Sequence, residues 1–268
     1  MTPEERLKSI GAVFEDKDDN EYFVSLCGTS VSFEKLERSL DIDYKIILVG
    51  GPSGSGKTYL LNKFFREYGK WHHIFMYKSN NFALESLCDI YAKISREKRD
   101  SPRVCIQKLA TLDEPITIIL DEAQLYSKEI IDTVRVLSNE KFLRFILAVS
   151  DDSNLAIKDE QFESRIYEKI NLSRLNHKEI KYFIEEKLLL AGASNYFLKF
   201  NNKSFRLISK LTGGNIRKLN RLLNKVFTLL PSNVDDSLNV NSKKINKYIE
   251  MVAIDLQLIK KKWFFIWG

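Results

Sequence analysis

One run of residues combines glycines with a lysine and a hydroxyl side chain: Gly51-Pro52-Ser53-Gly54-Ser55-Gly56-Lys57-Thr58. It matches the pattern G-x-x-x-x-G-K-[ST] and follows an apolar, β-rich run, Tyr44–Val49. Glycines let the backbone wrap closely, so that successive N–H groups and a helix N-terminus point at a phosphate. Lys57 would reach the β- and γ-phosphates, and the Thr58 hydroxyl would take one position on Mg²⁺. The run predicts a nucleotide site in which we include the next residue, Tyr59.

A pair of carboxylates follows a second apolar run, Ile118-Ile119-Leu120, at Asp121 and Glu122. Asp121 can hold Mg²⁺ through water, and Glu122 can polarise the water that attacks the γ-phosphate. Two acidic residues after a strand are also common turn residues. Together with the glycine-rich loop they predict nucleotide hydrolysis.

Three further side chains complete the expected catalytic set. Ser150 ends the apolar run Phe145–Val149, where a polar group can sense the γ-phosphate or position water. Arg165 is placed like an arginine that reaches the nucleotide of an adjacent subunit, which predicts a homo-oligomer. Arg217 follows Gly213-Gly214-Asn215-Ile216 and can contact the phosphates from the helical part of the chain. The alternative for each arginine is an ordinary solvated surface residue.

Strands and helices must alternate to position these residues. Short apolar runs are separated by segments of helical periodicity, which predicts a parallel sheet covered on both faces. The expected strands are 44–49, 74–77, 116–120 and 145–149, and the expected helices between them include residues 60–65, 82–94 and 130–137.

After about Leu172 only helical patterns remain. Asn176 with Glu179 resembles a capping box, and Gly192 can end that helix. Further helices are expected near 202–211, 215–230 and 242–259. The predicted organisation is an N-terminal extension (1–29), an α/β nucleotide-binding core (30–172), a helical lid (173–258) and a basic-aromatic tail (259–268).

The charge distribution is uneven. The chain of 268 residues has a net charge of +6, yet Lys187 to Val234 holds nine Lys and Arg and no Asp or Glu. Such a stretch creates a positive field that attracts phosphates, nucleic acid or anionic lipid, unless it is simply a solvated helical surface. With 44% hydrophobic and 29% charged residues, the composition excludes collagen-like and wholly disordered chains. The three cysteines are too few and too scattered for a disulfide framework or a zinc module.

The two ends of the sequence bear on location. Residues 1–14 lack the apolar segment of a signal peptide, and no run approaches the length of about 20 apolar residues that a spanning helix needs. Lys260-Lys261-Lys262 followed by Trp263–Trp267 resembles the cytosolic edge of a membrane helix, or else an aromatic tail folded back on the domain. We therefore expect a cytoplasmic protein that can lie peripherally at the inner membrane.

The order of these motifs resembles that of AAA+ ATPases, which implies a P-loop fold with ATP and Mg²⁺ as cofactors. Leu120–Leu125 and Val134–Glu140 are similar to the ExeA/GspA/MshM group of secretion and pilus ATPases. Tyr182–Ala193 and Gly214–Asn220 support the likeness, which runs from about residue 30 to 230. One departure is Ser150, because the group has a glutamine there.

The resemblance implies a role in a secretion, pilus or DNA-uptake apparatus at the inner membrane, with a component of that apparatus as partner. An alternative is an ATP-dependent DNA-binding protein similar to the transposition ATPases TniB and MuB, with DNA bound through the basic lid. A third interpretation is a nucleotide-binding switch with little turnover.

Overall fold

A computed structural model describes residues 2–15, 24, 26–150, 160–230 and 242–259. The chain divides into two units, Cys27–Ser173 and a second made of Met1–Leu26 with Arg174–Gly268. We call them the core unit and the helical unit. Residues 2–15, expected to belong to a separate N-terminal extension, thus lie with the helices of the second unit.

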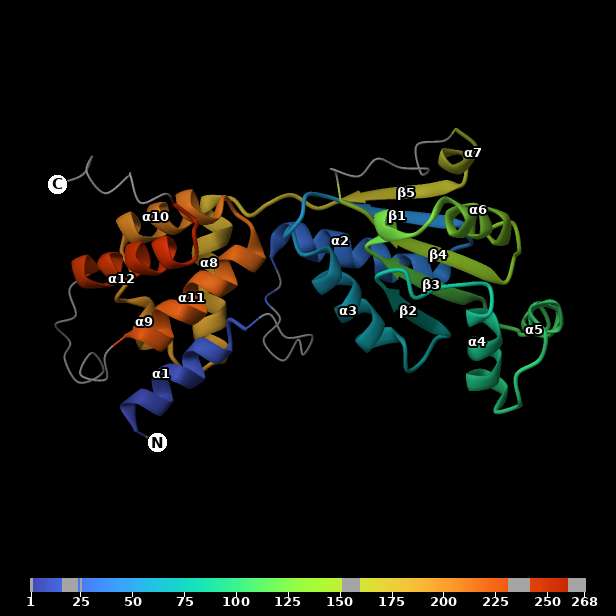
Figure 1. The fold of residues 1–268 in the computed structure, drawn as a ribbon, viewed down its shortest axis with the longest axis horizontal. Coiled ribbons are helices and arrows are strands. Elements are labelled where there is room, and N and C mark those ends of the chain that lie inside the picture. Colours follow the sequence, from blue (N-terminus) through green and yellow to red (C-terminus); the bar gives the residue numbers. More distant parts are fainter. Residues whose placement is uncertain (1, 16–23, 25, 151–159, 231–241, 260–268) are drawn as a thin grey trace. The chain divides into compact units, whose positions relative to one another are not determined.

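The core unit is built on a five-stranded sheet of order β2-β3-β4-β1-β5 in which every neighbouring pair is parallel (Figure 1). In its register, Ile119 of β3 pairs with Met76 of β2 on one side and with Ile146 of β4 on the other. The strands are β1 (Ile46–Gly50), β2 (Ile74–Lys78), β3 (Ile116–Asp121), β4 (Leu143–Ala148) and β5 (Ile166–Asn171).

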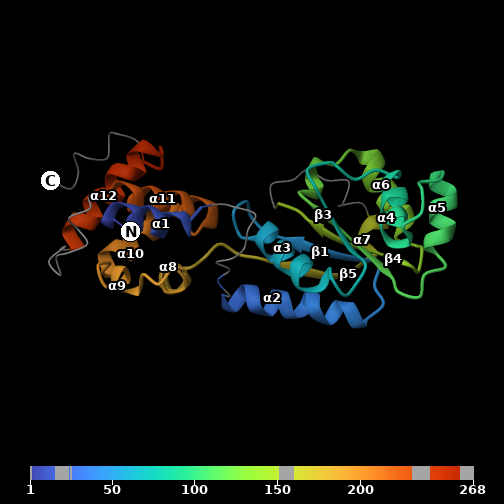
Figure 2. The same ribbon diagram turned by 90° about the horizontal axis from the view of Figure 1, so that it is seen from below.

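Helices cover both faces of this sheet (Figures 1 and 2). Ile118 and Leu120 belong to a core with residues of α4, α5 and α6, whereas Ile119 belongs to a core with residues of α2 and α3. Alternate residues of β3 therefore face opposite layers, which explains its continuous apolar sequence. The helices are α2 (Cys27–Arg38), α3 (Lys57–Tyr68), α4 (Ser86–Ser95), α5 (Pro102–Leu109), α6 (Lys128–Leu137) and the short α7 (Glu160–Glu163).

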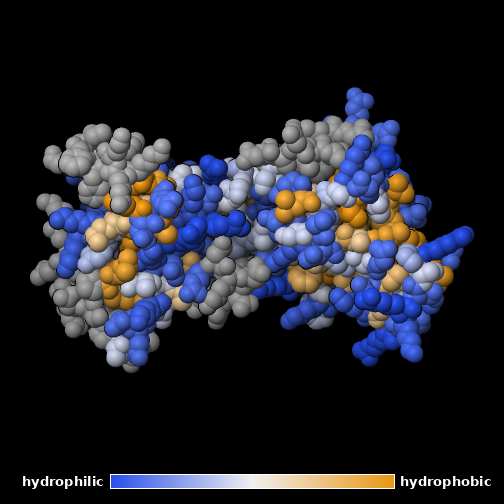
Figure 3. Space-filling model, viewed as in Figure 1, coloured by the Kyte–Doolittle hydropathy of each residue, from blue (hydrophilic) through white to orange (hydrophobic). Residues whose placement is uncertain are grey.

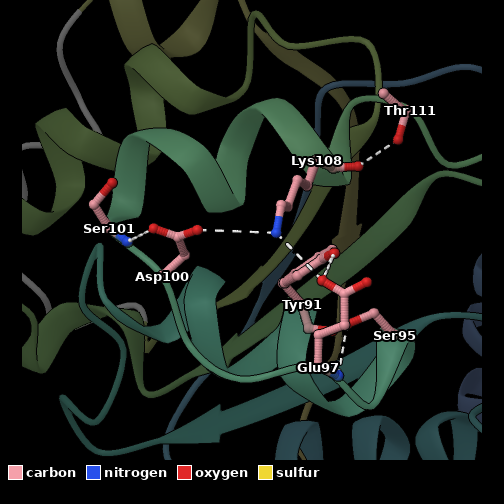
Figure 4. Close-up of polar contacts among 7 residues, drawn as sticks. All are labelled: Tyr91, Ser95, Glu97, Asp100, Ser101, Lys108 and Thr111. Carbon is pink, nitrogen blue, oxygen red and sulfur yellow. Dashed lines mark hydrogen bonds and ion pairs between the residues drawn. The ribbon is translucent and has the colours of Figure 1, made fainter.

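A polar cluster holds the loop between α4 and α5 (Figure 4). The Glu97 carboxylate accepts a hydrogen bond from the Tyr91 hydroxyl at 2.7 Å and one from Lys108 Nζ at 3.2 Å. Lys108 also lies 3.9 Å from Asp100 and 5.0 Å from the centroid of the Tyr91 ring. The hydrogen bonds from Tyr91 and Lys108 lower the pKa of Glu97. The cluster fixes the helix pair that covers one face of the sheet beside β2 and β3.

The helical unit has a core of its own, formed by α8 (His177–Leu190), α9 (Ser194–Phe197), α10 (Asn202–Thr212), α11 (Ile216–Leu229), α12 (Ser242–Asp255) and α1 (Pro3–Ala12). Asn176 caps α8, and Glu179 completes the predicted capping box. Phe14, which follows α1, stacks on Phe227 of α11 with ring centroids 5.7 Å apart. Sequence periodicity alone did not predict α1, because its apolar face is short.

The predicted architecture, a parallel α/β core with an all-helical second part, is confirmed. Sequence analysis missed α5, and it began α4 at Phe82 although the helix begins at Ser86. It also assigned no strand to Ile166–Asn171, an edge strand in which the adjacent charged residues Glu168 and Lys169 interrupt the apolar ones. Edge strands lack the continuous apolar run on which a prediction of a buried strand depends.

The described residues can be compared with two expectations from the sequence, one about disulfide bonds and one about membrane-spanning helices. Cys88 and Cys105 are buried free thiols. Among the described residues, no helix has the length and apolar composition that crossing a bilayer requires. The basic-aromatic tail, residues 260–268, lies outside the described residues.

Candidate functional site

The glycine-rich loop connects β1 to α3 at the carboxyl edge of the sheet. Its first residue, Gly51, has φ +145°, and a Cβ there would lie 2.3 Å from the carbonyl oxygen of Leu172. Only glycine fits this backbone conformation and this close approach to the end of β5. The loop is thereby packed against the core before it turns into the helix.

Lys57, the first residue of α3, is buried and folds back over the loop. Its Nζ donates hydrogen bonds to the carbonyl oxygens of Gly51, at 2.6 Å, and Pro52, at 3.2 Å. Ser55 Oγ is buried beside it without a hydrogen-bond partner. An ammonium, an unsatisfied hydroxyl and a helix N-terminus at one short loop are the donors that a phosphate group requires. The residues present therefore fit a nucleotide phosphate.

The structure brings together the two predicted metal ligands, Thr58 on α3 and Asp121 at the end of β3. Their side chains are hydrogen-bonded, and Asp121 is only 3% exposed. Burial raises the pKa of Asp121, and the hydrogen bonds from Thr58 and from the Glu122 backbone oppose that rise. A hydroxyl and a carboxylate oxygen in contact fit Mg²⁺, a hard cation that prefers oxygen ligands and keeps several waters.

Glu122 follows Asp121 in the left-handed region, with φ 53° and ψ 45°. Its N–H donates to Asp121 Oδ1 at 2.9 Å, and its Oε2 accepts a hydrogen bond from Ser79 Oγ at 2.9 Å. Sequence analysis missed Ser79. The available signal was its place directly after the strand β2, which ends at the same edge of the sheet as β3.

Ser150 lies after β4, and its N–H donates to Gln124 Oε1 at 3.3 Å. Gln124 belongs to the short 3₁₀ turn Ala123–Leu125 that follows Glu122. Hydrogen bonds thus link the segments after three neighbouring strands, from Ser79 after β2 to Glu122 after β3 and from Gln124 to Ser150 after β4. Sequence analysis assigned no role to Gln124.

The structure does not bring Arg165 to the glycine-rich loop of its own chain. Arg165 directly precedes β5, so it lies at the amino edge of a parallel sheet whose carboxyl edge carries the loop. Its guanidinium donates to the Gln161 carbonyl oxygen, and its Nε is buried without a partner. Arg217 is an exposed residue in the first turn of α11, in the helical unit. Tyr59 is half-buried in the first turn of α3.

Three comparisons place these features among known proteins. Residues 42–154 match a family model described as an AAA domain. No curated protein sequence matches the chain significantly.

Several solved structures are similar to this chain at low sequence identity. Cdc6p from Pyrobaculum aerophilum has a TM-score of 0.62 and 15% identity, over 81% of this chain and 64% of that one. Drosophila ORC, in a structure bound to DNA, has a TM-score of 0.61 and 14% identity, over 92% and 66%. Thermotoga maritima RuvB, a Holliday junction branch migration motor, has a TM-score of 0.55 and 18% identity, over 87% and 70%.

These sequence identities are too low to support an inference of function, but the structural similarity establishes the fold. The chain spans just under two thirds of the Cdc6p chain that it matches. The glycine-rich loop, Asp121 and Glu122 all lie within the residues that match the family model. Residues 42–154 of the chain therefore match the AAA domain model, and the sheet has the strand order typical of AAA+ P-loop proteins.

Proposed function

We propose that this protein binds ATP with Mg²⁺ and hydrolyses it. The observation that carries the proposal is the contact between Thr58 and Asp121 beside the buried Lys57, with Glu122 adjacent. The match of residues 42–154 to the AAA domain model also supports the proposal.

Each residue has a defined task in this proposal. Lys57 turns from the carbonyl oxygens of Gly51 and Pro52 to the β- and γ-phosphates, and backbone N–H groups of the loop bind the same phosphates. Thr58 and Asp121 would hold a magnesium ion, which would supply positive charge beside the phosphates. Glu122 orients a water in line with the γ-phosphate and polarises it, while Ser150 faces the γ-phosphate from β4.

The deciding experiment separates binding from hydrolysis. Calorimetry with magnesium and a non-hydrolysable ATP analogue should give saturable heat for the wild type and for Glu122→Gln alike, because the glutamine keeps the shape of the side chain. Hydrolysis should fall by at least about 100-fold in Glu122→Gln, the lower range for loss of a general base. Glu140→Gln, an exposed residue of the same unit, should leave both measurements unchanged.

The outcomes discriminate between the functions. Absence of heat in the wild type would overturn the whole proposal. Retained binding with equally slow turnover in the wild type and Glu122→Gln would identify a nucleotide-dependent switch and not an ATPase.

The position of Arg165 supports a homo-oligomer in which this side chain completes the site of a neighbouring subunit. A guanidinium at the amino edge of the sheet cannot reach the loop at the carboxyl edge of its own core, since five-residue strands separate them by roughly 17 Å. Hydrolysis per subunit should therefore rise with protein concentration in the wild type. A mixture of inactive Arg165→Ala and inactive Lys57→Met chains should recover activity, and failure to do so would count against the shared site.

ATP hydrolysis by this protein could drive either of two processes. The motif resemblance supports a secretion, pilus or DNA-uptake apparatus at the inner membrane, with peripheral membrane contact through residues 260–268, which lie outside the described residues. The second candidate is a DNA-processing role. A specific observation favours it, namely the cationic outer faces of α10 and α11, and two similar structures are described with DNA.

A further inference from the structure

The structure sorts the nine cations of the basic segment into buried and exposed groups. Lys187 is only 5% exposed, and its Nζ donates to the Val13 carbonyl oxygen at 2.9 Å, at the end of α1. Lys225 forms an ion pair with Asp255 of α12. Lys199 lies over the ring of Tyr196, 4.5 Å from its centroid. The remaining six cations are exposed and all lie on α10 and α11: Lys203, Arg206, Lys210, Arg217, Lys218 and Arg221.

Both helices repeat one pattern. Cations recur at i, i+3 and i+7 on α10, as Lys203, Arg206 and Lys210, and on α11, as Lys218, Arg221 and Lys225. In each helix the apolar positions on the opposite side are buried in the unit's own core. Residues spaced in this way share one helical face. The outward face of each helix is therefore a cationic stripe, and neither helix contains an acidic residue.

The four cations Lys203, Arg206, Lys218 and Arg221 make no ion pair with any other residue that the structure describes. We call these four the cationic face. A protein's own structure normally offers nearby carboxylates to lysine and arginine, since surfaces carry interspersed charges of both signs. Within the described part of the chain no carboxylate neutralises these four charges, so their field can attract an anionic partner.

The turn between the helices is fixed. Gly213 and Gly214 both have positive φ, and the Gly214 carbonyl oxygen accepts a hydrogen bond from the Leu175 N–H at 3.0 Å. Asn215 then caps α11 through the N–H of Lys218 at 3.0 Å. Because the two helices are held by this turn and by a shared core, the two stripes are displayed with little loss of conformational entropy on binding.

We propose that the cationic face binds the phosphate backbone of duplex DNA without reading its sequence. Each stripe rises about 10 Å from its first to its last cation, and B-DNA presents about six phosphate charges over that length. A helix fits the wide major groove of B-DNA and not the deep, narrow one of A-form RNA. Lysine and arginine contacts to phosphates position a protein but do not specify bases.

An anionic membrane is the competing partner, and the apolar side of the helices argues against it. Interfacial helices bury an apolar face in the lipid, whereas the apolar faces of α10 and α11 are already buried in the unit's core. In the view of Figure 3, the described surface of the helical unit mixes hydrophilic side chains with small hydrophobic patches.

The inference deepens the DNA-processing candidate of the proposed function, and its test does not depend on ATP hydrolysis. The probe is a fluorescent duplex of about 30 base pairs, in two unrelated sequences, titrated with the full-length chain at several salt concentrations. The test variant combines Lys203→Gln, Arg206→Gln and Arg221→Gln and leaves Arg217 intact. The matched control combines Lys70→Gln, Lys128→Gln and Lys141→Gln, which removes the same charge from exposed positions of the core unit.

The wild type should bind both duplexes equally, with affinity that falls steeply with salt. The test variant should weaken binding at least about 10-fold and reduce the salt slope by about 3, one for each contact removed. The control should stay within a factor of about 3 of the wild type at low salt. Nucleotide binding, measured in parallel by calorimetry, should be the same in all three proteins.

Three results would overturn the inference. They are no duplex binding by the wild type at low salt, equal losses in the test and control variants, and binding to phosphatidylserine vesicles but not to duplex. If ATP binding is absent but duplex binding follows the expected pattern, the proposed ATPase fails and the cationic face stands.

Discussion

Ser79 Oγ donates a hydrogen bond to Glu122 Oε2 at 2.9 Å, which connects the end of β2 to the carboxylate proposed to polarise water. Both residues have positive φ, 49° for Ser79 and 53° for Glu122. This hydrogen bond occupies one oxygen of the carboxylate and holds the side chain against the end of β2. The contact therefore restrains Glu122 in the nucleotide-free structure.

Removing this hydroxyl should raise hydrolysis. We expect Ser79→Ala to increase the turnover number by about 2- to 10-fold, which corresponds to the net value of one hydrogen bond, while nucleotide affinity stays unchanged. Ser79→Asn is the matched control, because asparagine tolerates positive φ and supplies an N–H donor in place of the hydroxyl. A fall in turnover for Ser79→Ala would instead show that the hydrogen bond holds Glu122 in its productive orientation.

Lys57 should determine nucleotide affinity. Charge-assisted hydrogen bonds are worth about 1.5–3 kcal/mol each, so Lys57→Met should weaken binding of the ATP analogue by about 10- to 100-fold in calorimetry. Lys63→Met changes a lysine of the same helix whose Nζ lies 3.7 Å from Glu67, and it should leave affinity unchanged. Equal affinities for Lys57→Met and the wild type would remove Lys57 from the site.

The Asp121 side chain should lower the free energy of unfolding of the protein when no nucleotide is bound. Its pKa is raised by burial, so the folded state binds a proton more readily than the unfolded state does. Stability from this group is therefore greatest at low pH and decreases as pH rises through the raised pKa. In urea denaturation without metal, Asp121→Asn should be more stable than the wild type at neutral pH, and the difference should shrink as the pH falls through that pKa.

Asp121→Asn should also abolish magnesium-dependent hydrolysis. This substitution should therefore increase stability and remove function. Asp113→Asn, an exposed position of the core unit, should change neither property. A lower stability of Asp121→Asn across the whole pH range would mean that the ionised carboxylate contributes favourable interactions that exceed its desolvation cost.

Sequence patterns predicted the parts of the fold whose signals are local. The run at Ile116–Leu120 is apolar because β3 is covered on both faces, and Asn176 with Glu179 caps α8 as expected. The contact between Thr58 and Asp121 could be anticipated from strand order, because parallel strands bring their carboxyl ends to one edge.

What escaped prediction depends on the register of neighbouring elements. Ser79 and Gln124 have no distinctive neighbours in the sequence, and only the pairing of β2, β3 and β4 gives them their partners Glu122 and Ser150. Lys187 counted as a surface cation in the sequence, yet it is buried at the end of α1, more than 170 positions away. Such contacts are tertiary, and composition does not reveal them.

Gly213 and Gly214 offer a matched pair for the turn between α10 and α11. Both have positive φ, but a Cβ on Gly213 would meet nothing within 4 Å, whereas one on Gly214 would lie 2.1 Å from the Leu175 carbonyl oxygen. Gly213→Ala should lower the free energy of unfolding by about 1 kcal/mol, because alanine disfavours the left-handed backbone conformation. Gly214→Ala should lower the free energy of unfolding by about 2 kcal/mol more than Gly213→Ala does. The turn must then move, and it loses the hydrogen bond donated by the Leu175 N–H. Hydrogen exchange in α10 and α11 should therefore accelerate far more in Gly214→Ala, and equal acceleration in the two variants would show that Leu175 does not constrain the turn.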